Sequence, residues 1–210
     1  MIKKNWSILL ITSIVILLPI LAGLFLWNQL PEQLPMHWDA NGQVDGWGSK
    51  TFVVVGMPLI MLAFQWVCVL ATMADPKQKD HSEKVLQLVF WIIPLLTLVL
   101  FAITFAVGLG KQVPVEVILT LFLGFLFTVI GNYMPKCKQN YTIGIKIPWT
   151  LNSEQNWNKT HRFAGVTWTI GGIIIMLSGF VGGIWLLMAI TLLMAIVPVV
   201  YSFILYRKGI

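Results

Sequence analysis

The residues of this chain that could do chemistry gather in two polar segments, residues 28–50 and 134–162. The second segment holds a set of polar side chains that could form a docking site: Asn140, Lys146, Glu154, His161 and Arg162. His161 and Glu154 could also act as an acid–base pair. The segment contains one histidine, one glutamate and no Ser-x-x-Lys or His-x-x-x-His arrangement. Catalysis is therefore disfavoured, and we expect neither an enzyme nor a cofactor.

Oxygen-donor side chains alternate along the first segment, as in a calcium loop: Asp39, Asn41, Gln43 and Asp45. An EF-hand needs Gly at its sixth position and Glu at its twelfth, where this chain has Val44 and Lys50. His37 has no second histidine nearby in this segment. We therefore expect no metal site, and favour an ordered cap that contacts a ligand.

The local structure of the first segment follows from its turn residues. Asn41-Gly42 is a strong turn signal, and Pro31 and Pro35 favour an extended chain before it. The sequence therefore predicts a small β-hairpin. We take five of its residues as candidate ligand contacts: Pro35, His37, Trp38, Asp39 and Gly42.

A helix is predicted to begin within the second segment. Asn152 with Gln155 fits an N-cap and its capping-box partner, and the helix continues into the next apolar run. Gly165 would let another helix approach closely. Four residues share one face of this helix: Trp157, His161, Ala164 and Trp168. An amphipathic helix anchored at a membrane interface and a polar docking site both remain open.

Six long apolar runs must position these two segments, and at ~1.5 Å per residue each is long enough to cross a bilayer. A tight turn at Gly182-Gly183 separates the last two. The expected spans are Trp6–Trp27, Phe52–Ala74, Val85–Gly108, Val117–Tyr133, Phe163–Val181 and Ile184–Tyr206.

The basic residues sort by loop. With the N-terminus in the cytoplasm, the outer side holds only Lys50 and Lys111 of the 14 Lys and Arg residues, which is a strong positive-inside signal. The sequence thus predicts an all-α integral membrane protein with six transmembrane helices and both termini in the cytoplasm. Residues 1–110 form the N-terminal membrane half, with extracellular loop 28–50, and residues 111–210 form the C-terminal half, with cytoplasmic loop 134–162. The net charge of +6 reflects the cytoplasmic loops, so no direct contact with nucleic acid is expected. The inner set is Lys3, Lys4, Lys77, Lys79, Lys84, Lys136, Lys138, Lys146, Lys159, Arg162, Arg207 and Lys208.

No Asp, Glu, Lys, Arg or His lies deep in any span, which disfavours a proton-driven transporter. A small-solute transporter or exporter stays as the alternative, because prolines can kink helices around a cavity and Gln65 could line it. The prolines within spans are Pro19, Pro58, Pro94 and Pro198.

The two polar segments resemble the SdpI/YfhL family of bacterial membrane proteins. The first carries Leu-Pro-Met-His-Trp from Leu34 and resembles a family-associated domain of unknown function. The second carries Asn-Tyr-x-x-Gly-Ile-x-x-Pro-Trp-Thr-Leu from Asn140, then Glu-x-x-Trp and Thr-His-Arg. This second motif is long and specific. One departure is Lys146, where the family generally has Arg; lysine keeps the charge and loses the planar bidentate fork.

The resemblance implies a non-enzymatic protein of a bacterial cytoplasmic membrane that protects the cell against a secreted, hydrophobic toxic peptide. In the best-known case it implies a second role as a signal receptor, in which the occupied protein holds a cytoplasmic transcriptional repressor at the membrane. The expected partners are the toxin, the repressor and the lipid bilayer. The candidate partner residues of the second segment are Asn140, Gly144, Lys146, Pro148, Trp149, Thr150, Glu154, Trp157, His161 and Arg162.

Overall fold

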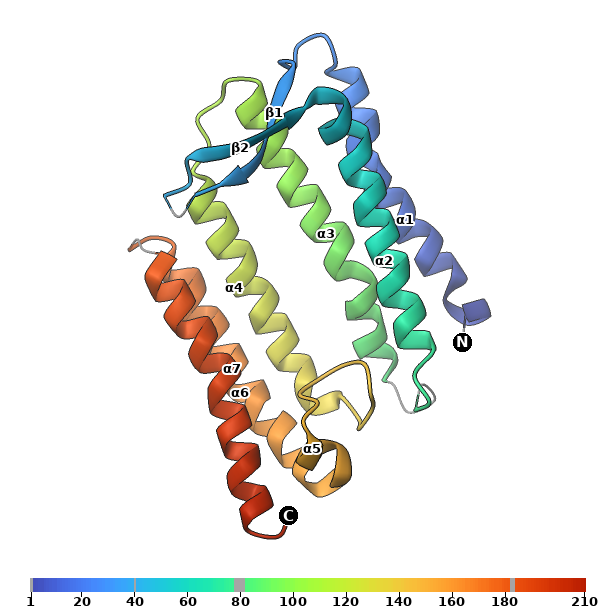
Figure 1. The fold of residues 1–210 in the computed structure, drawn as a ribbon, viewed down its shortest axis with the longest axis vertical. Coiled ribbons are helices and arrows are strands. Elements are labelled where there is room, and N and C mark those ends of the chain that lie inside the picture. The colour runs from blue at the N-terminus through green and yellow to red at the C-terminus, as the bar shows by residue number, and fades with distance from the viewer. Residues whose placement is uncertain (1, 40, 78–81, 182–183) are drawn as a thin grey trace. The chain divides into compact units, whose positions relative to one another are not determined.

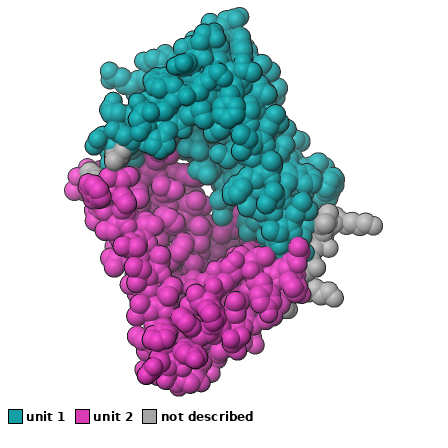
Figure 2. Space-filling view, viewed as in Figure 1, with its two compact units in different colours: residues 1–73, 89–116 teal, residues 74–88, 117–210 magenta. Residues whose placement is uncertain are grey.

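A computed structural model describes residues 2–39, 41–77, 82–181 and 184–210, with side chains from Asn5 onward. The chain forms two compact units, coloured separately in Figure 2. Unit 1 comprises residues 1–73 and 89–116, and unit 2 comprises residues 74–88 and 117–210. The expected turn at Gly182-Gly183 lies outside the described residues, as do the side chains of Lys3, Lys4 and Lys79.

The chain is mostly helical, as predicted (Figure 1). Unit 1 contains α1 (Ile2–Phe25), β1 (Gln33–Trp38), β2 (Val44–Ser49), the π-helix η1 (Phe52–Gly56), α2 (Met57–Met73) and most of α3 (Glu83–Gly108). Unit 2 contains the start of α3, nearly all of α4 (Val115–Tyr133), the 3-10 helix η3 (Met134–Lys136), α5 (Pro148–Asn152), α6 (Glu154–Ser178) and α7 (Ile184–Arg207).

Five helices of the described chain are long and apolar enough to cross a membrane: α1, α2 with η1, α3, α4 and α7. These helices make the chain a multi-pass membrane protein. α6 has the length but not the composition, because its first nine residues, Glu154–Arg162, are largely polar and carry three charges.

A side chain from another helix replaces the backbone hydrogen bond that Pro94 removes from α3. Proline has no N–H, so the carbonyl of Phe90, four residues earlier, lacks its helical donor. The amide Nε2 of Gln65, fully buried in α2, donates to that carbonyl at 2.9 Å. Gln65 is therefore part of the helix packing of unit 1.

The same compensation occurs in unit 2. Pro198 of α7 leaves the carbonyl of Met194 without a helical donor. The indole N–H of Trp168 in α6 donates to it at 2.8 Å. This bond joins α6 to α7 at the turn where Pro198 removes a backbone hydrogen bond from α7.

Two glycine pairs bring the backbones of α4 and α6 into contact. A Cβ added at Gly124 would lie 2.6 Å from the carbonyl oxygen of Gly172, and one added at Gly165 would lie 2.9 Å from that of Gly131. Each helix has its glycines seven residues apart, so both pairs fall on one antiparallel seam. The close approach predicted at Gly165 is confirmed.

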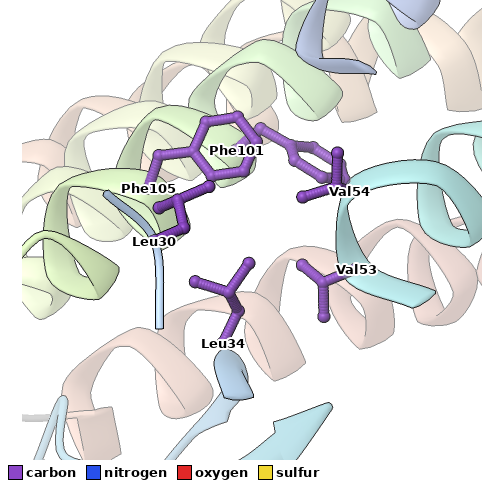
Figure 3. Close-up of a cluster of buried hydrophobic side chains, with 6 residues drawn as sticks. All are labelled: Leu30, Leu34, Val53, Val54, Phe101 and Phe105. Carbon is purple, nitrogen blue, oxygen red and sulfur yellow. The ribbon is translucent and has the colours of Figure 1, made fainter. Parts of the chain in front are cut away.

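The predicted hairpin is also confirmed. β1 and β2 pair antiparallel, with irregular register around His37. Leu34 of β1 is fully buried in an apolar cluster with Leu30, Val53, Val54, Phe101 and Phe105 (Figure 3). After β2, Lys50 turns inward. Its ammonium donates to the carbonyls of Leu30 (3.0 Å) and Trp27 (3.3 Å), beyond the end of α1. The hairpin is thereby fixed to the helices of unit 1.

The bond between Gln65 and the Phe90 carbonyl can be tested by a double-mutant cycle. We expect Gln65→Leu to lower the free energy of unfolding by about 1 kcal/mol. Pro94→Ala restores the helical N–H, so Gln65→Leu should cost less in that background. In both backgrounds Gln65→Leu also removes the unpaired Oε1 of Gln65. The difference between the two costs therefore reports the bond to the Phe90 carbonyl. Thermal unfolding in detergent measures it, and an equal cost in both backgrounds would contradict the assignment.

Candidate functional site

The turn of the β-hairpin is organised by Asp39. Its carboxylate accepts the backbone N–H groups of Asn41 (2.9 Å) and Gln43 (2.8 Å), and the Gln43 N–H lowers the pKa of the Asp39 carboxyl. Gly42 has φ +74°, a conformation that glycine adopts without strain. Asp39 and Gly42 therefore shape the turn.

The other candidates of the hairpin differ in exposure. Pro35 is buried, and its carbonyl accepts from the Thr104 hydroxyl at 3.4 Å. Trp38 is half-buried. His37 is exposed, with Nδ1 2.5 Å from a carboxylate oxygen of Asp45. His37 is thus the candidate most open to a ligand.

In the motif loop, residues 134–162, Asn140 is the central organiser. Its side chain is buried and its Nδ2 donates to the carbonyls of Lys138 (2.8 Å) and Ile143 (2.9 Å). Its Oδ1 accepts the N–H groups of Thr142 (2.9 Å) and Ile143 (2.6 Å). These bonds fold the loop around a single amide.

Gly144 and His161 fit against each other. Gly144 has φ +113°, and an added Cβ would collide with Nε2 of His161. That same Nε2 accepts the N–H of Ile145 at 3.0 Å, so Nδ1 carries the proton and donates to the Trp157 carbonyl at 2.9 Å. Burial lowers the pKa of His161 to about 4, although the bond to Trp157 opposes the shift. His161 is neutral, with both ring nitrogens engaged.

Trp157 completes this cluster. It is fully buried, stacks on the His161 ring at 4.0 Å between centroids, and donates from its indole to the Cys137 carbonyl at 2.8 Å. Burial raises the pKa of the Cys137 thiol to about 11, so the thiol is unreactive. A small cavity of about 70 Å³ lies beside it, lined by Val85, Leu88, Ile130, Tyr133, Met134, Cys137, Ile143, Gly144 and His161.

The short helix α5 carries the next three motif residues. Pro148 opens it and Trp149 stacks on Tyr206 of α7 at 5.8 Å. The buried Thr150 hydroxyl donates to the Ile145 carbonyl at 2.8 Å, which holds the preceding chain. Like Asn140 and His161, these residues mainly build the loop.

The predicted helix start at Asn152 is wrong. Asn152 ends α5, and the N-cap of α6 is Ser153, whose side chain accepts the N–H of Asn156 at 3.1 Å. The separate helix α5, which Pro148 initiates, occupies the residue that the capping pattern selected.

Three charged motif residues are exposed. Lys146 donates to the Thr142 carbonyl at 2.9 Å. Whereas Trp157 and His161 of α6 are buried, Glu154 and Arg162 of the same helix are exposed. With their neighbours they line an open cleft of about 560 Å³ formed by Pro135, Glu154, Gln155, Asn158, Lys159 and Arg162. The motif therefore divides into a buried part and an exposed face of α6.

Asp75 lies outside the motif loop in the sequence but bonds to it and holds it in place. It was not among the residues selected from the sequence. It follows α2 and is 2% exposed. One carboxylate oxygen accepts both the Tyr141 N–H and the Thr142 hydroxyl at 2.8 Å. Lys77, on the same connector, donates to the Gln139 side chain at 2.5 Å. No local pattern marks these residues, because their partners lie more than sixty positions away.

Asn156 was also missed. It is fully buried in α6, donates to the Ser202 carbonyl at 3.1 Å and accepts the Ser202 hydroxyl at 2.6 Å. An asparagine one position before the buried Trp157, on a face otherwise lined by small residues, was the available signal.

The arrangement offers binding surfaces. The neutral His161 has no free nitrogen to take a proton from a substrate, and Glu154 lies two helical turns before it, about 10 Å away along the axis of α6. Within the described residues, no three His, Cys, Asp or Glu side chains are grouped so as to hold a metal ion.

These features define a multi-pass membrane protein with a hairpin and a folded motif loop, and comparisons show which known proteins it resembles. The sequence profile of the SdpI/YfhL protein family matches residues 136–202. A domain of unknown function, DUF1648, matches residues 14–62, which include the hairpin. The resemblance to the SdpI/YfhL family is thereby confirmed.

One similar protein is Immunity protein SdpI of Bacillus subtilis (strain 168). The two sequences are 28% identical over 209 residues, which cover 98% of this chain and 97% of that protein. No solved structure matches the chain.

The neutral state of His161 predicts a pH dependence. Its pKa is about 4 in the folded chain and 6.5 when exposed, so between these values the unfolded chain binds the extra proton. Stability should therefore fall as pH drops from about 6.5 to about 4, by up to about 3 kcal/mol. His161→Gln should flatten this slope, and His37→Gln, at an exposed histidine, should keep it. Thermal unfolding between pH 7 and 4.5 checks this; an unchanged slope in His161→Gln would refute it.

The bonds to Asp75 predict how well the motif loop resists cutting by a protease. Asp75→Ala leaves the Tyr141 N–H without an acceptor, which should favour local opening. We expect trypsin to cut the loop about tenfold faster, at Lys136, Lys138 or Lys146. Glu154→Ala removes an exposed acid from the same unit and should not change the rate. Equal cutting of the two variants would show that Asp75 does not hold the loop.

Proposed function

We propose that this chain is an immunity protein that protects a bacterial cell against a secreted, hydrophobic toxic peptide, without catalysing a reaction. The observation that carries the proposal is the similarity to Immunity protein SdpI, which extends over 98% of this chain. It includes both the hairpin and the motif loop, the two segments with the densest specific contacts. Capture of a toxin needs no second conformational state, since binding alone removes free toxin.

The proposed topology has six spans in the cytoplasmic membrane, with both termini in the cytoplasm. Five helices have the length and composition of spans. The sixth would be α6 from Phe163 onward, which packs along α7 and is tied to it by Trp168. The excess of Lys and Arg in the loops assigned to the cytoplasm supports this orientation. It makes the hairpin extracellular and the motif loop cytoplasmic.

Toxin contact is assigned to the hairpin. His37 is exposed, and Asp39 carries a carboxylate at the turn. Pro35 and Gly42 act on the toxin only through the shape of the hairpin, because Pro35 is buried and Gly42 forms the turn.

A second role as a signal receptor is assigned to the exposed face of α6. Glu154, Asn158 and Arg162 lie one turn apart and line a cleft open to the cytoplasm in this topology. A cytoplasmic transcriptional repressor is the partner proposed for that face. The buried motif residues would act by holding α6 and its loop in place.

The two alternative functions, transport and catalysis, each depended on a side chain that is engaged in the fold. A transporter lined by Gln65 is disfavoured, because Gln65 is fully buried and bonded to Phe90. An interfacial enzyme using His161 is disfavoured by the engagement of both ring nitrogens.

A survival assay tests immunity. The chain is expressed in a toxin-sensitive bacterium without its own immunity gene, and challenged with a peptide toxin secreted by a strain that carries an SdpI-type immunity protein. We expect protection. His37→Ala should lower the tolerated toxin concentration about tenfold, the effect of losing one important contact.

The matched control is Arg162→Ala, which alters an exposed residue of the motif loop and should leave protection intact. Membrane fractions establish equal protein levels. Cells that die although the wild-type chain is present in their membrane would show that the function is a different one.

A further inference from the structure

One face of the β-hairpin carries mostly exposed side chains, with Pro35 as its buried member. Side chains alternate along a strand, and residues opposite each other across a pair share a face. Gln33 lies opposite Ser49, and Pro35 lies opposite Trp47. Asp45 is two positions from Trp47 on the same strand, so these side chains are on one side. His37, where the register is irregular, reaches Asp45. Leu34 is on the other side, in the apolar cluster. We name this side the hairpin's exposed face: Gln33, His37, Asp45, Trp47 and Ser49, all exposed.

Trp47 is large, apolar and 54% exposed. Its neighbours are explained by packing: a Cβ at Gly46 would lie 2.8 Å from Cβ of His37, and one at Gly48 would collide with the Met36 sulfur. No such constraint requires an indole at position 47. Tryptophan with an open flank is the residue type most enriched among energetically dominant binding contacts.

The charge of the hairpin is negative where it is accessible. Its one lysine, Lys50, is 7% exposed and bonded to the Leu30 carbonyl and to Glu32. The Asp45 side chain is 47% exposed, and within the described residues only one of its carboxylate oxygens has a partner, His37. Asp39 adds a second carboxylate at the turn. Such a surface attracts positive charge.

We propose that this face binds a cationic amphipathic peptide segment. An apolar side chain of the peptide packs on the Trp47 indole, and a Lys or Arg lies by Asp45, where it also interacts with the indole ring. The inference rests on the proposed immunity function and narrows it. It names the charge class of the peptide and two contacts, Trp47 and Asp45, beyond those already assigned.

The first test needs no variant. The full chain, in nanodiscs of phosphatidylcholine, is titrated with two fluorescent synthetic peptides that share their apolar residues and differ in carrying Lys or Glu. Empty nanodiscs give the contribution of the bilayer. The Lys peptide should bind more tightly, and its advantage should shrink as salt rises. Equal affinity of the two peptides overturns the proposal.

The second test places the peptide on this face. Trp47→Ala should weaken binding of the Lys peptide about tenfold, and Asp45→Asn about threefold. Matched controls are Trp185→Ala, at an exposed tryptophan of α7, and Glu83→Gln, at an exposed acid at the start of α3; neither should change the affinity. If Trp47→Ala leaves binding unchanged, or weakens both peptides equally because the indole anchors the chain in the bilayer, the proposal is wrong.

The survival assay separates this inference from the immunity function. Protection of cells without any preference for the Lys peptide would reject the cationic partner and leave immunity standing. Charge-selective binding through Trp47 without protection would support the surface and reject immunity.

Discussion

Backbone carbonyls that lack a helical donor must be bonded by side chains, because the apolar surroundings offer no water. This constraint explains where the long polar side chains lie. Gln65 and Trp168 each donate to a carbonyl freed by a proline of another helix. Lys50 donates to two carbonyls beyond the end of α1, and Gln139 to two at the end of α5. Trp157 does the same for a loop carbonyl. Within each unit, bonds of this type join segments that are distant in the sequence.

The same bond changes how the motif is understood. Three polar residues of the motif would be natural candidates for partner contacts: Asn140, Thr150 and His161. The side chain of each is hydrogen-bonded to backbone groups of the loop itself. A specific sequence pattern can therefore describe how a loop folds. What faces outward from the motif is a different set, led by Glu154 and Arg162. The hairpin shows the same division between Leu34, which anchors it, and Trp47, which does not.

Much of the fold could be predicted, because its signals are local. Runs of apolar residues indicated the helices, and Asn41-Gly42 indicated the hairpin. The N-cap of α6 was misplaced by one residue, since Pro148 begins an extra short helix that no periodicity revealed. Asp75 could not be found, because a single acid after a helix resembles any loop residue until its distant partners are known. Within the candidate site, residue types could be read from the chain, but no local pattern separates its buried members from its exposed ones.

The position of Asp75 has a consequence for synthesis of the chain. One of its carboxylate oxygens accepts from Tyr141 and Thr142, which follow it by 66 and 67 residues. At a ribosomal speed of ~5–20 residues per second, this carboxylate waits about 3–13 s for its partners to be made. During that time residues 74–88 belong to a unit whose remaining part does not yet exist. The connector between α2 and α3 must stay hydrated while these two helices enter the bilayer. Its charged residues favour contact with water during that time. Membrane insertion of the first helices and completion of the motif loop are thus separate events in time.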